Sequence, residues 1–293
     1  MGANAADRGV SVFLKLNIDP TVSTCTLSIW SVVEDETFCH ALAAIYLRRP
    51  THARKIIEEL QPGPMIFGGL EIKNAIELLH VETADIADAL ASGDPKISAA
   101  AGKTLEARVS HRDGLLFQHV SWVAGTLQHP AAKAKAPHVR VAEKGFDGLF
   151  LEVANGHFTK LILCEDKATV NPRNTVVGKV WPELLSTESG EKDLELVDAV
   201  TALLDTMMPE NDRVAVIDGA IWGQLRQYRV AVTAAPKDTR AGGYGHIFEG
   251  FESKTLIPNT TRFGEVMPFD DIRSQLQVLA DKIILRLRQI ANV

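Results

Sequence analysis

Apolar and polar positions recur along the chain with two different periods, which predict a mixture of strands and helices. Residues 11–33 hold two runs of strand-forming residues separated by the turn-forming pair Asp19-Pro20. Apolar residues recurring at three- and four-residue steps then predict three helices, at 35–49, 52–61 and 82–93. The intervening stretch 68–81 is ambiguous between helix and loop.

The second half of the chain is organised around a predicted helix and a hairpin. The helix covers 112–128, with Leu115 and Trp122 on its apolar stripe, and the hairpin covers 145–169, with two apolar runs on either side of Asn155-Gly156. The same patterns predict helices over 171–186 (broken at Pro182), 191–207 and 269–291, and strands over 213–218 and 228–235. Strands and helices that alternate in this way predict an α/β fold.

Composition narrows the class of protein. The 293 residues are 46% hydrophobic and carry a net charge of −6, so the chain can build a large core but is not basic overall. Three scattered cysteines indicate free thiols in a reducing compartment, and neither a signal peptide nor a membrane-spanning segment is evident. We therefore expect a cytoplasmic protein with an α+β region over 1–105 and a second domain over 106–293.

The hairpin gathers charges at one end of two apolar strands. Asp147 begins the first strand, and Glu165, Asp166 and Lys167 end the second. Side chains alternate along a strand, so Glu165 and Lys167 share a face, whereas Asp166 points away and is expected to be solvated or to cap a helix. A two-residue turn at Asn155-Gly156 would place Asp147 opposite Cys164, on the wrong face. Asp147 joins Glu165 only if a longer loop or a β-bulge near Gly156 shifts the register by one residue.

These residue types suit metal-dependent phosphodiester chemistry. Mg²⁺ takes hard oxygen ligands, commonly one or two carboxylates with several waters. A lysine beside the carboxylates can stabilise negative charge that develops on a phosphate. Asp147 and Glu165 are therefore candidate ligands of Mg²⁺ or Mn²⁺, and Lys167 is a candidate catalytic residue.

The pattern of Asp, turn and a second apolar strand ending in Glu-x-Lys resembles the PD-(D/E)XK nuclease superfamily. The resemblance implies a restriction-endonuclease-like mixed sheet flanked by helices, and DNA as the substrate. Many members carry Glu or Gln on the helix before the hairpin, and Gln118, on the apolar stripe of its helix, is the matching residue. Two departures are that Phe146 precedes Asp147 where the family name has proline, and that position 118 is Gln rather than Glu.

The layout also resembles the nuclease subunit of Hachiman-type anti-phage defence systems, which implies a helicase partner. Two other interpretations are also compatible with the residue types. One is a catalytically silent nucleic-acid-binding or regulatory subunit that keeps the nuclease fold, as the Gln at position 118 suggests. The other is an ordinary α/β scaffold in which the charges of the hairpin are incidental.

Residues 222–262 contain a local excess of positive charge. Six basic residues in this segment outnumber three acidic ones, and they are Arg226, Arg229, Lys237, Arg240, Lys254 and Arg262. Contact with the backbone of a nucleic acid and ordinary surface charge explain this excess equally well. The glycines at 242, 243 and 245 lack the spacing of a phosphate-binding loop and predict a mobile loop over the site.

Overall fold

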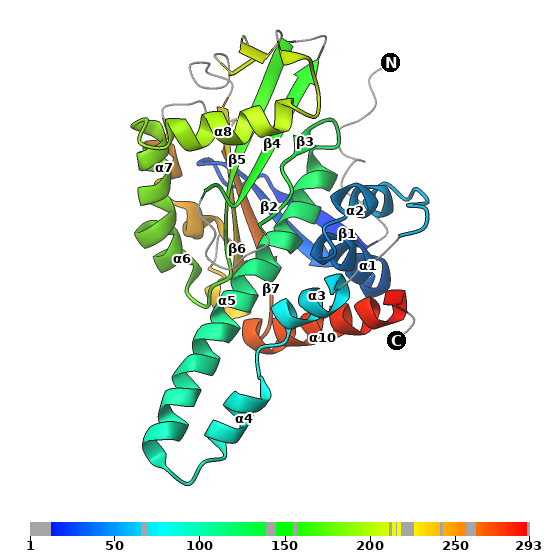
Figure 1. Ribbon diagram of the computed structural model, residues 1–293. Helices are drawn as coiled ribbons and strands as arrows, with labels where there is room; N and C mark the ends of the chain where they lie inside the picture. Colours follow the sequence, from blue (N-terminus) through cyan, green and yellow to red (C-terminus); the bar gives the residue numbers. More distant parts are fainter. Residues whose placement is uncertain are drawn as a thin grey trace.

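The protein is built around one mixed β-sheet with helices on both faces (Figure 1). The computed structural model describes residues 13–291 except 66–69, 139–144, 155–156, 211–212, 215, 218–225, 241–242 and 256–261. The prediction of an α/β fold with a mixed sheet flanked by helices is confirmed.

The sheet has seven strands in the order β1-β2-β7-β6-β5-β4-β3. Their bounds are Leu14–Asp19 (β1), Thr26–Val32 (β2), Lys133–Ala134 (β3), Gly148–Ala154 (β4), His157–Lys167 (β5), Arg226–Ala234 (β6) and Arg262–Pro268 (β7). The four central strands β2, β7, β6 and β5 run parallel, and antiparallel strands flank them on each side. Parallel strands are normally covered on both faces, which agrees with the continuous apolar runs in the sequence.

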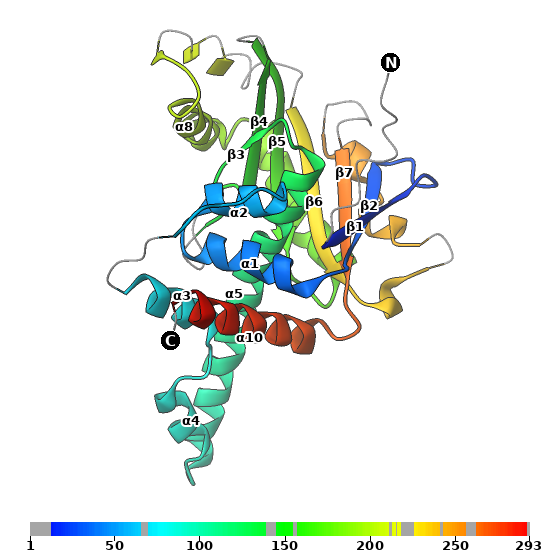
Figure 2. The ribbon, with the colours of Figure 1, turned by 90° about the vertical axis from the view of Figure 1, so that its right-hand side faces the viewer.

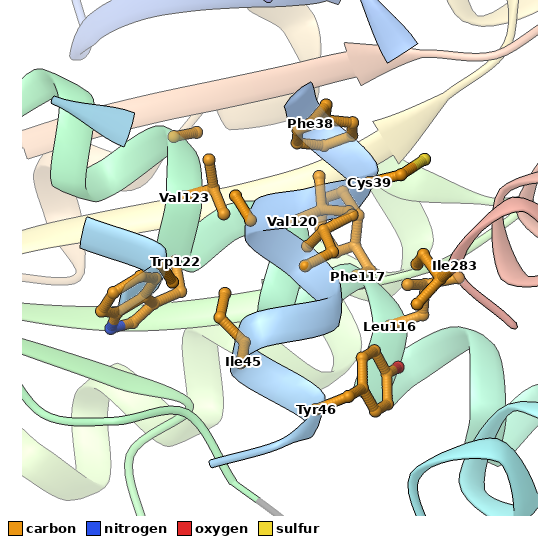
Figure 3. Packing of buried hydrophobic residues seen from close by; sticks show 14 of the residues in the cluster. Phe38, Cys39, Ile45, Tyr46, Leu116, Phe117, Val120, Trp122, Val123 and Ile283 are labelled. Atoms are coloured by element: carbon orange, nitrogen blue, oxygen red, sulfur yellow. The ribbon is translucent and has the colours of Figure 1, made fainter. Parts of the chain in front are cut away.

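Five helices of the described part of the chain share a core on one face of the sheet. These are α1 (Asp35–Tyr46), α2 (Pro50–Ile57), α3 (Glu71–Leu79), α5 (Pro95–Gln128) and α10 (Ile272–Ala291). Figure 3 shows part of their packing, in which Phe38 and Ile45 of α1, Val120 of α5 and Ile283 of α10 belong to one cluster of buried side chains, with Ile283 beside Leu116. The predicted C-terminal helix and both N-terminal strands are thus confirmed as parts of one core.

Helix α5 is twice as long as the sequence pattern indicated. It begins at Pro95 behind an Asp94 N-cap and runs for 34 residues, whereas apolar periodicity predicted 112–128. Its N-terminal half has little to bury, so it and α4 (Ala84–Leu90) project from the body as a helical arm (Figures 1 and 2). Position 105 lies inside α5, and strands from both sides of it join the same sheet. The division into 1–105 and 106–293 stays a prediction.

The opposite face is covered by α6 (Pro172–Thr175), α7 (Trp181–Glu188) and α8 (Asp193–Leu204). A π-helical turn over Val176–Val180 joins α6 to α7, so Pro182 sits in the first turn of α7 and does not break the helix. The prediction of a strand at 213–218 is wrong, because the described residues 213–214 and 216–217 are helical. A short apolar run cannot distinguish strand from helix by periodicity alone.

The glycine-rich segment is packed rather than loose where it is described. Gly245–Phe248 and Phe251–Ser253 form 3₁₀ turns, and Ile247, Phe248 and Phe251 are fully buried in the core beneath them. The prediction of a mobile loop is therefore wrong for 243–255. Among the helices of the described residues, none combines the length and the apolar character needed to cross a bilayer.

Candidate active site

A β-bulge brings Asp147 onto the face that holds Glu165 and Lys167. Near the tip of the hairpin, Ala154 pairs with His157 and Val153 with Phe158, which is the register of a two-residue turn. Thr159 then has no partner, its hydroxyl donates to the carbonyl of Glu152 at 3.0 Å, and from Lys160 onwards the register is shifted by one residue. Gly148 consequently pairs with Cys164, and continuing this register places Asp147 opposite Glu165. The predicted bulge is confirmed, although residues 155–156 lie outside the described part of the chain.

The two carboxylates converge on a single ammonium group. Lys167 Nζ donates to Asp147 Oδ2 at 2.6 Å and to Glu165 Oε2 at 3.0 Å. The exposed fractions of the side chains are 11% for Asp147, 8% for Glu165 and 25% for Lys167, so solvent reaches the cluster on the lysine side. Glu165 and Lys167 follow Leu161 and Leu163 on the face covered by α6, α7 and α8.

Gln118 completes the cluster from α5. Its side-chain amide donates to Asp147 Oδ1 at 2.6 Å, while Asp147 Oδ2 also accepts from the backbone N–H of Asp166 at 2.9 Å. Both oxygens of Asp147 are therefore fixed by groups on rigid elements. The structure thus brings together all four residues singled out in the sequence.

A glycine lets α5 approach the sheet closely enough for this contact. A Cβ at Gly125 would lie 2.5 Å from Cζ of Phe150 on β4, so no other residue fits there without moving the ring. Gly125 lies two helical turns beyond Gln118 on the same helix. It thereby sets the distance between the helix that carries Gln118 and the strand that follows Asp147.

Burial and neighbouring charges perturb the ionisation of the cluster in opposite directions. Burial raises the pKa of Glu165 to about 7, although the charge of Lys167 opposes this shift. Burial by itself would lower the pKa of Lys167, but the charges of Glu165 and Asp147 outweigh it and hold that pKa above its usual value. Lys167 is thus the counter-ion that both carboxyl groups contact.

Asp166 is not solvated, and the expectation that it would be is wrong. It is 4% exposed and accepts a hydrogen bond from Ser121 Oγ at 2.6 Å, with Arg229 Nη1 at 3.6 Å. Arg229 also pairs with Glu265, which accepts from Trp30 Nε1 at 3.0 Å. Burial raises the pKa of Asp166 to about 7. Asp166 therefore joins a buried ionic network on one face of β5 to the carboxylate cluster on the other, through its backbone N–H.

The arrangement can hold a divalent cation with few protein ligands. In the part of the chain that the structure describes, no three His, Cys, Asp or Glu side chains are grouped to bind a metal. Asp147 and Glu165 nevertheless direct oxygens at one cation, the ammonium of Lys167. Two carboxylates with water in the remaining positions is a common environment for Mg²⁺. The donor set fits such an ion and does not fit a zinc site of three or four protein ligands.

The basic residues of segment 222–262 differ in their exposure to solvent. Arg229 and Arg262 are each 1% exposed, so they are unavailable to a partner. Lys237 and Arg240, in contrast, are exposed beyond the end of β6. The sequence alone gives no way to separate these two pairs.

A comparison of the chain with family models, with curated proteins and with solved structures finds no match.

Proposed function

We propose that this protein is a metal-dependent nuclease that hydrolyses phosphodiester bonds of DNA. The observation that carries the proposal is the convergence of Asp147, Glu165 and Lys167, which the bulge at Thr159 makes possible. A strand end with incidental charges has no need of a register shift that places a third charged residue on the same face. The mixed sheet flanked by helices also supports the resemblance to PD-(D/E)XK nucleases.

Each residue has a role that follows from its contacts. Asp147 and Glu165 would hold Mg²⁺ or Mn²⁺, which supplies charge neutralisation at the phosphate and activates water. Gln118 and the backbone N–H of Asp166 fix the carboxylate of Asp147. Lys167, the most exposed charged group of the cluster, would stabilise the negative charge that develops on the phosphate.

Cleavage of linear and circular DNA with Mg²⁺ or Mn²⁺ tests the proposal. We expect Glu165→Ala and Lys167→Ala each to reduce the rate by roughly 100-fold or more. The same hairpin provides matched controls, because Glu152 and Lys160 form an ion pair of 3.6 Å near its other end. Glu152→Ala and Lys160→Ala should cleave like the wild type. Equal losses in all four variants would show that the effect is general destabilisation, not loss of a site.

A wild type that cuts nothing requires a second measurement. Calorimetric titration with Mn²⁺ then separates the alternatives, because a silent subunit that keeps the nuclease fold would still bind the ion through Asp147 and Glu165. Binding that is lost in Glu165→Ala and kept in Glu152→Ala identifies the silent subunit. Absence of binding in the wild type leaves incidental charges on an α/β scaffold.

The resemblance to Hachiman-type nuclease subunits extends the proposal to a role in anti-phage defence with a helicase partner. That extension rests on the layout of the chain. It is tested by co-purification with helicases encoded beside the gene, and recovery of the chain alone from its native host would contradict it.

A further inference from the structure

Two adjoining cavities lie beyond the carboxyl ends of β5 and β6, and together they are called the basic groove here. The nearer cavity, of about 170 Å³, is lined by Asn171, Arg173 and Lys237 among others. The farther one, of about 520 Å³, extends to the turn between β1 and β2 at Thr21–Thr24. Arg240 and His246 line both cavities, which makes the groove continuous.

The groove begins next to the candidate active site. Asn171 is the fourth residue after Lys167, so their Cα atoms are at most about 14 Å apart. The segment between them is fixed to β6, because Thr169 N–H donates to Thr233 Oγ1 at 2.7 Å and that hydroxyl donates back to Thr169 O at 2.8 Å. Asn171, at the near end of the groove, therefore lies no more than about 14 Å from Lys167, and the segment between them is held against β6.

The near cavity has the charge of an anion-binding surface. Arg173, Lys237 and Arg240 outnumber Asp238, on a chain whose net charge is −6. Asp238 is already engaged, since its Oδ2 accepts from the backbone N–H of Ala235 at 2.8 Å. Among the described residues, the side chains of Lys237 and Arg240 make no hydrogen bond or ion pair. Two cations are therefore available to a ligand.

Hydrogen bonds within the protein hold the backbone around the groove in place. Arg173 Nη1 donates to the carbonyls of Ile247 at 3.1 Å and Glu249 at 2.7 Å. Arg240 forms a two-way backbone bridge with Gly243, which adopts a φ of +72° that glycine tolerates readily. His246 Nδ1 is buried without a partner in the described part of the chain. The backbone around the groove is therefore held in place, while the side chains of Lys237 and Arg240, within the described ranges, are free to reach a ligand.

A third cavity, of about 310 Å³, lies beside Phe146, the residue before Asp147. It is lined by Glu195 and Asp198 of α8 and by Lys135, and the ammonium of Lys192 lies 5.6 Å from the centre of the Phe146 ring. Acidic and basic groups are therefore balanced among its described residues, whereas cations are in excess in the near cavity of the basic groove. A polyanion that reaches the site is consequently attracted more strongly towards the groove.

We infer that the basic groove is the path by which one strand of a nucleic acid leaves the active site, with its backbone phosphates on Arg173, Lys237 and Arg240. This inference rests on the proposed nuclease function and specifies how its substrate is held. The farther cavity, at 520 Å³, is within the size range of pockets that enclose small organic ligands and can accept a sugar and base. Contacts of this kind are to the backbone, so they carry no base sequence.

Fluorescence anisotropy of a labelled oligonucleotide in EDTA, where no metal supports cleavage, tests this path. The variant Lys237→Glu/Arg240→Glu should bind single-stranded DNA roughly tenfold more weakly or worse. The slope of log affinity against log salt should become shallower by about 1.4, because about 0.7 is lost for each phosphate contact. The control is Lys96→Glu/Lys103→Glu on the helical arm, which changes the net charge equally at two exposed positions. It should bind within about twofold of the wild type.

The possible outcomes distinguish failure of the proposed path from failure of the proposed nuclease function. Equal losses in groove and control variants, with cleavage by the wild type intact, would overturn the path and leave the nuclease standing. Displacement of the oligonucleotide by AMP at matched concentration would also overturn it, because the groove would then be a mononucleotide site. A wild type that neither binds nor cleaves nucleic acid would overturn the proposed function itself.

Discussion

Replacing Lys167 by methionine gives the sharpest test of how the charged cluster is held. The substitution keeps most of the side-chain volume but removes the ammonium that lies 2.6 Å from Asp147 and 3.0 Å from Glu165. Leaving buried charges without their partner typically costs about 3–5 kcal/mol. Because Lys167 is 25% exposed, the low end of that range applies, about 3 kcal/mol. For a chain of this size, that corresponds to a fall in Tm of roughly 6 °C.

Thermal unfolding with and without Mn²⁺ measures this effect. Lys160→Met, at the other end of the same hairpin, is the matched control. Its Tm should stay within about 1 °C of the wild type, because its ion pair with Glu152 is long, at 3.6 Å, and both side chains are partly exposed. A cation that takes the place of the ammonium should restore Lys167→Met, with about 2.7 kcal/mol gained at 100 times the Kd. If Lys167→Met is as stable as the control, or if Mn²⁺ leaves its Tm unchanged, the carboxylates do not form a cation site.

Two further predictions concern the stability of the packing around α5. Gly125→Ala should lower the free energy of unfolding by about 1–3 kcal/mol in urea, since its Cβ would meet the ring of Phe150. Gly102→Ala, in open space on the same helix, should be neutral or stabilising, and equal effects would refute the close approach. Burial lowers the pKa of His119 to about 4 and of His129 to about 3. The contribution of each histidine to stability is therefore complete above the unfolded pKa of about 6.5 and falls with pH below it, by up to about 1.4 kcal/mol per pH unit. Glu165 and Asp166, whose pKa burial raises to about 7, change stability in the opposite direction, so the histidine effect is read as a difference between two proteins. In urea titrations, the free energy of unfolding of His129→Gln should gain on that of the wild type by up to about 1.4 kcal/mol per pH unit as pH falls below about 6.5, and a constant difference would assign the acid sensitivity elsewhere.

The elements that the sequence predicted well are those whose pattern is local. The hairpin, β6 and α10 all have strong periodicity or a turn pair, and each is present. The first half of α5 lacks an apolar stripe because it projects from the body, so hydrophobic periodicity gave no sign of it. The start of α5 could nevertheless have been predicted, because Asp94 is a favourable N-cap residue and Pro95 occupies the first turn of the helix.

For the candidate site, too, features set by local sequence could be predicted, whereas contacts between distant residues could not. Counting residues along the hairpin was enough to require a bulge, because the side-chain period of two makes register a question of odd or even. The role of Asp166 was missed, although its position on the apolar face with Ile162 and Cys164 signalled that a buried carboxylate would need a partner. The sequence could not identify the partners of Asp166, because Ser121 and Arg229 are 108 residues apart in the chain and only the fold brings them together.

The position of the bulge has a practical consequence for changing this protein. Thr159 lies between the tip of the hairpin and the charged residues, so the pairing that places Asp147 opposite Glu165 is set below the tip. Residues added at Asn155-Gly156 leave that pairing intact, which makes the tip a suitable place to insert a tag or a reporter. A single residue added between Lys160 and Glu165, in contrast, would turn Glu165 and Lys167 to the opposite face of the sheet. The hairpin therefore has one end whose length is free and another whose length is fixed, because even two added residues would move Glu165 about 7 Å along the strand, away from Asp147.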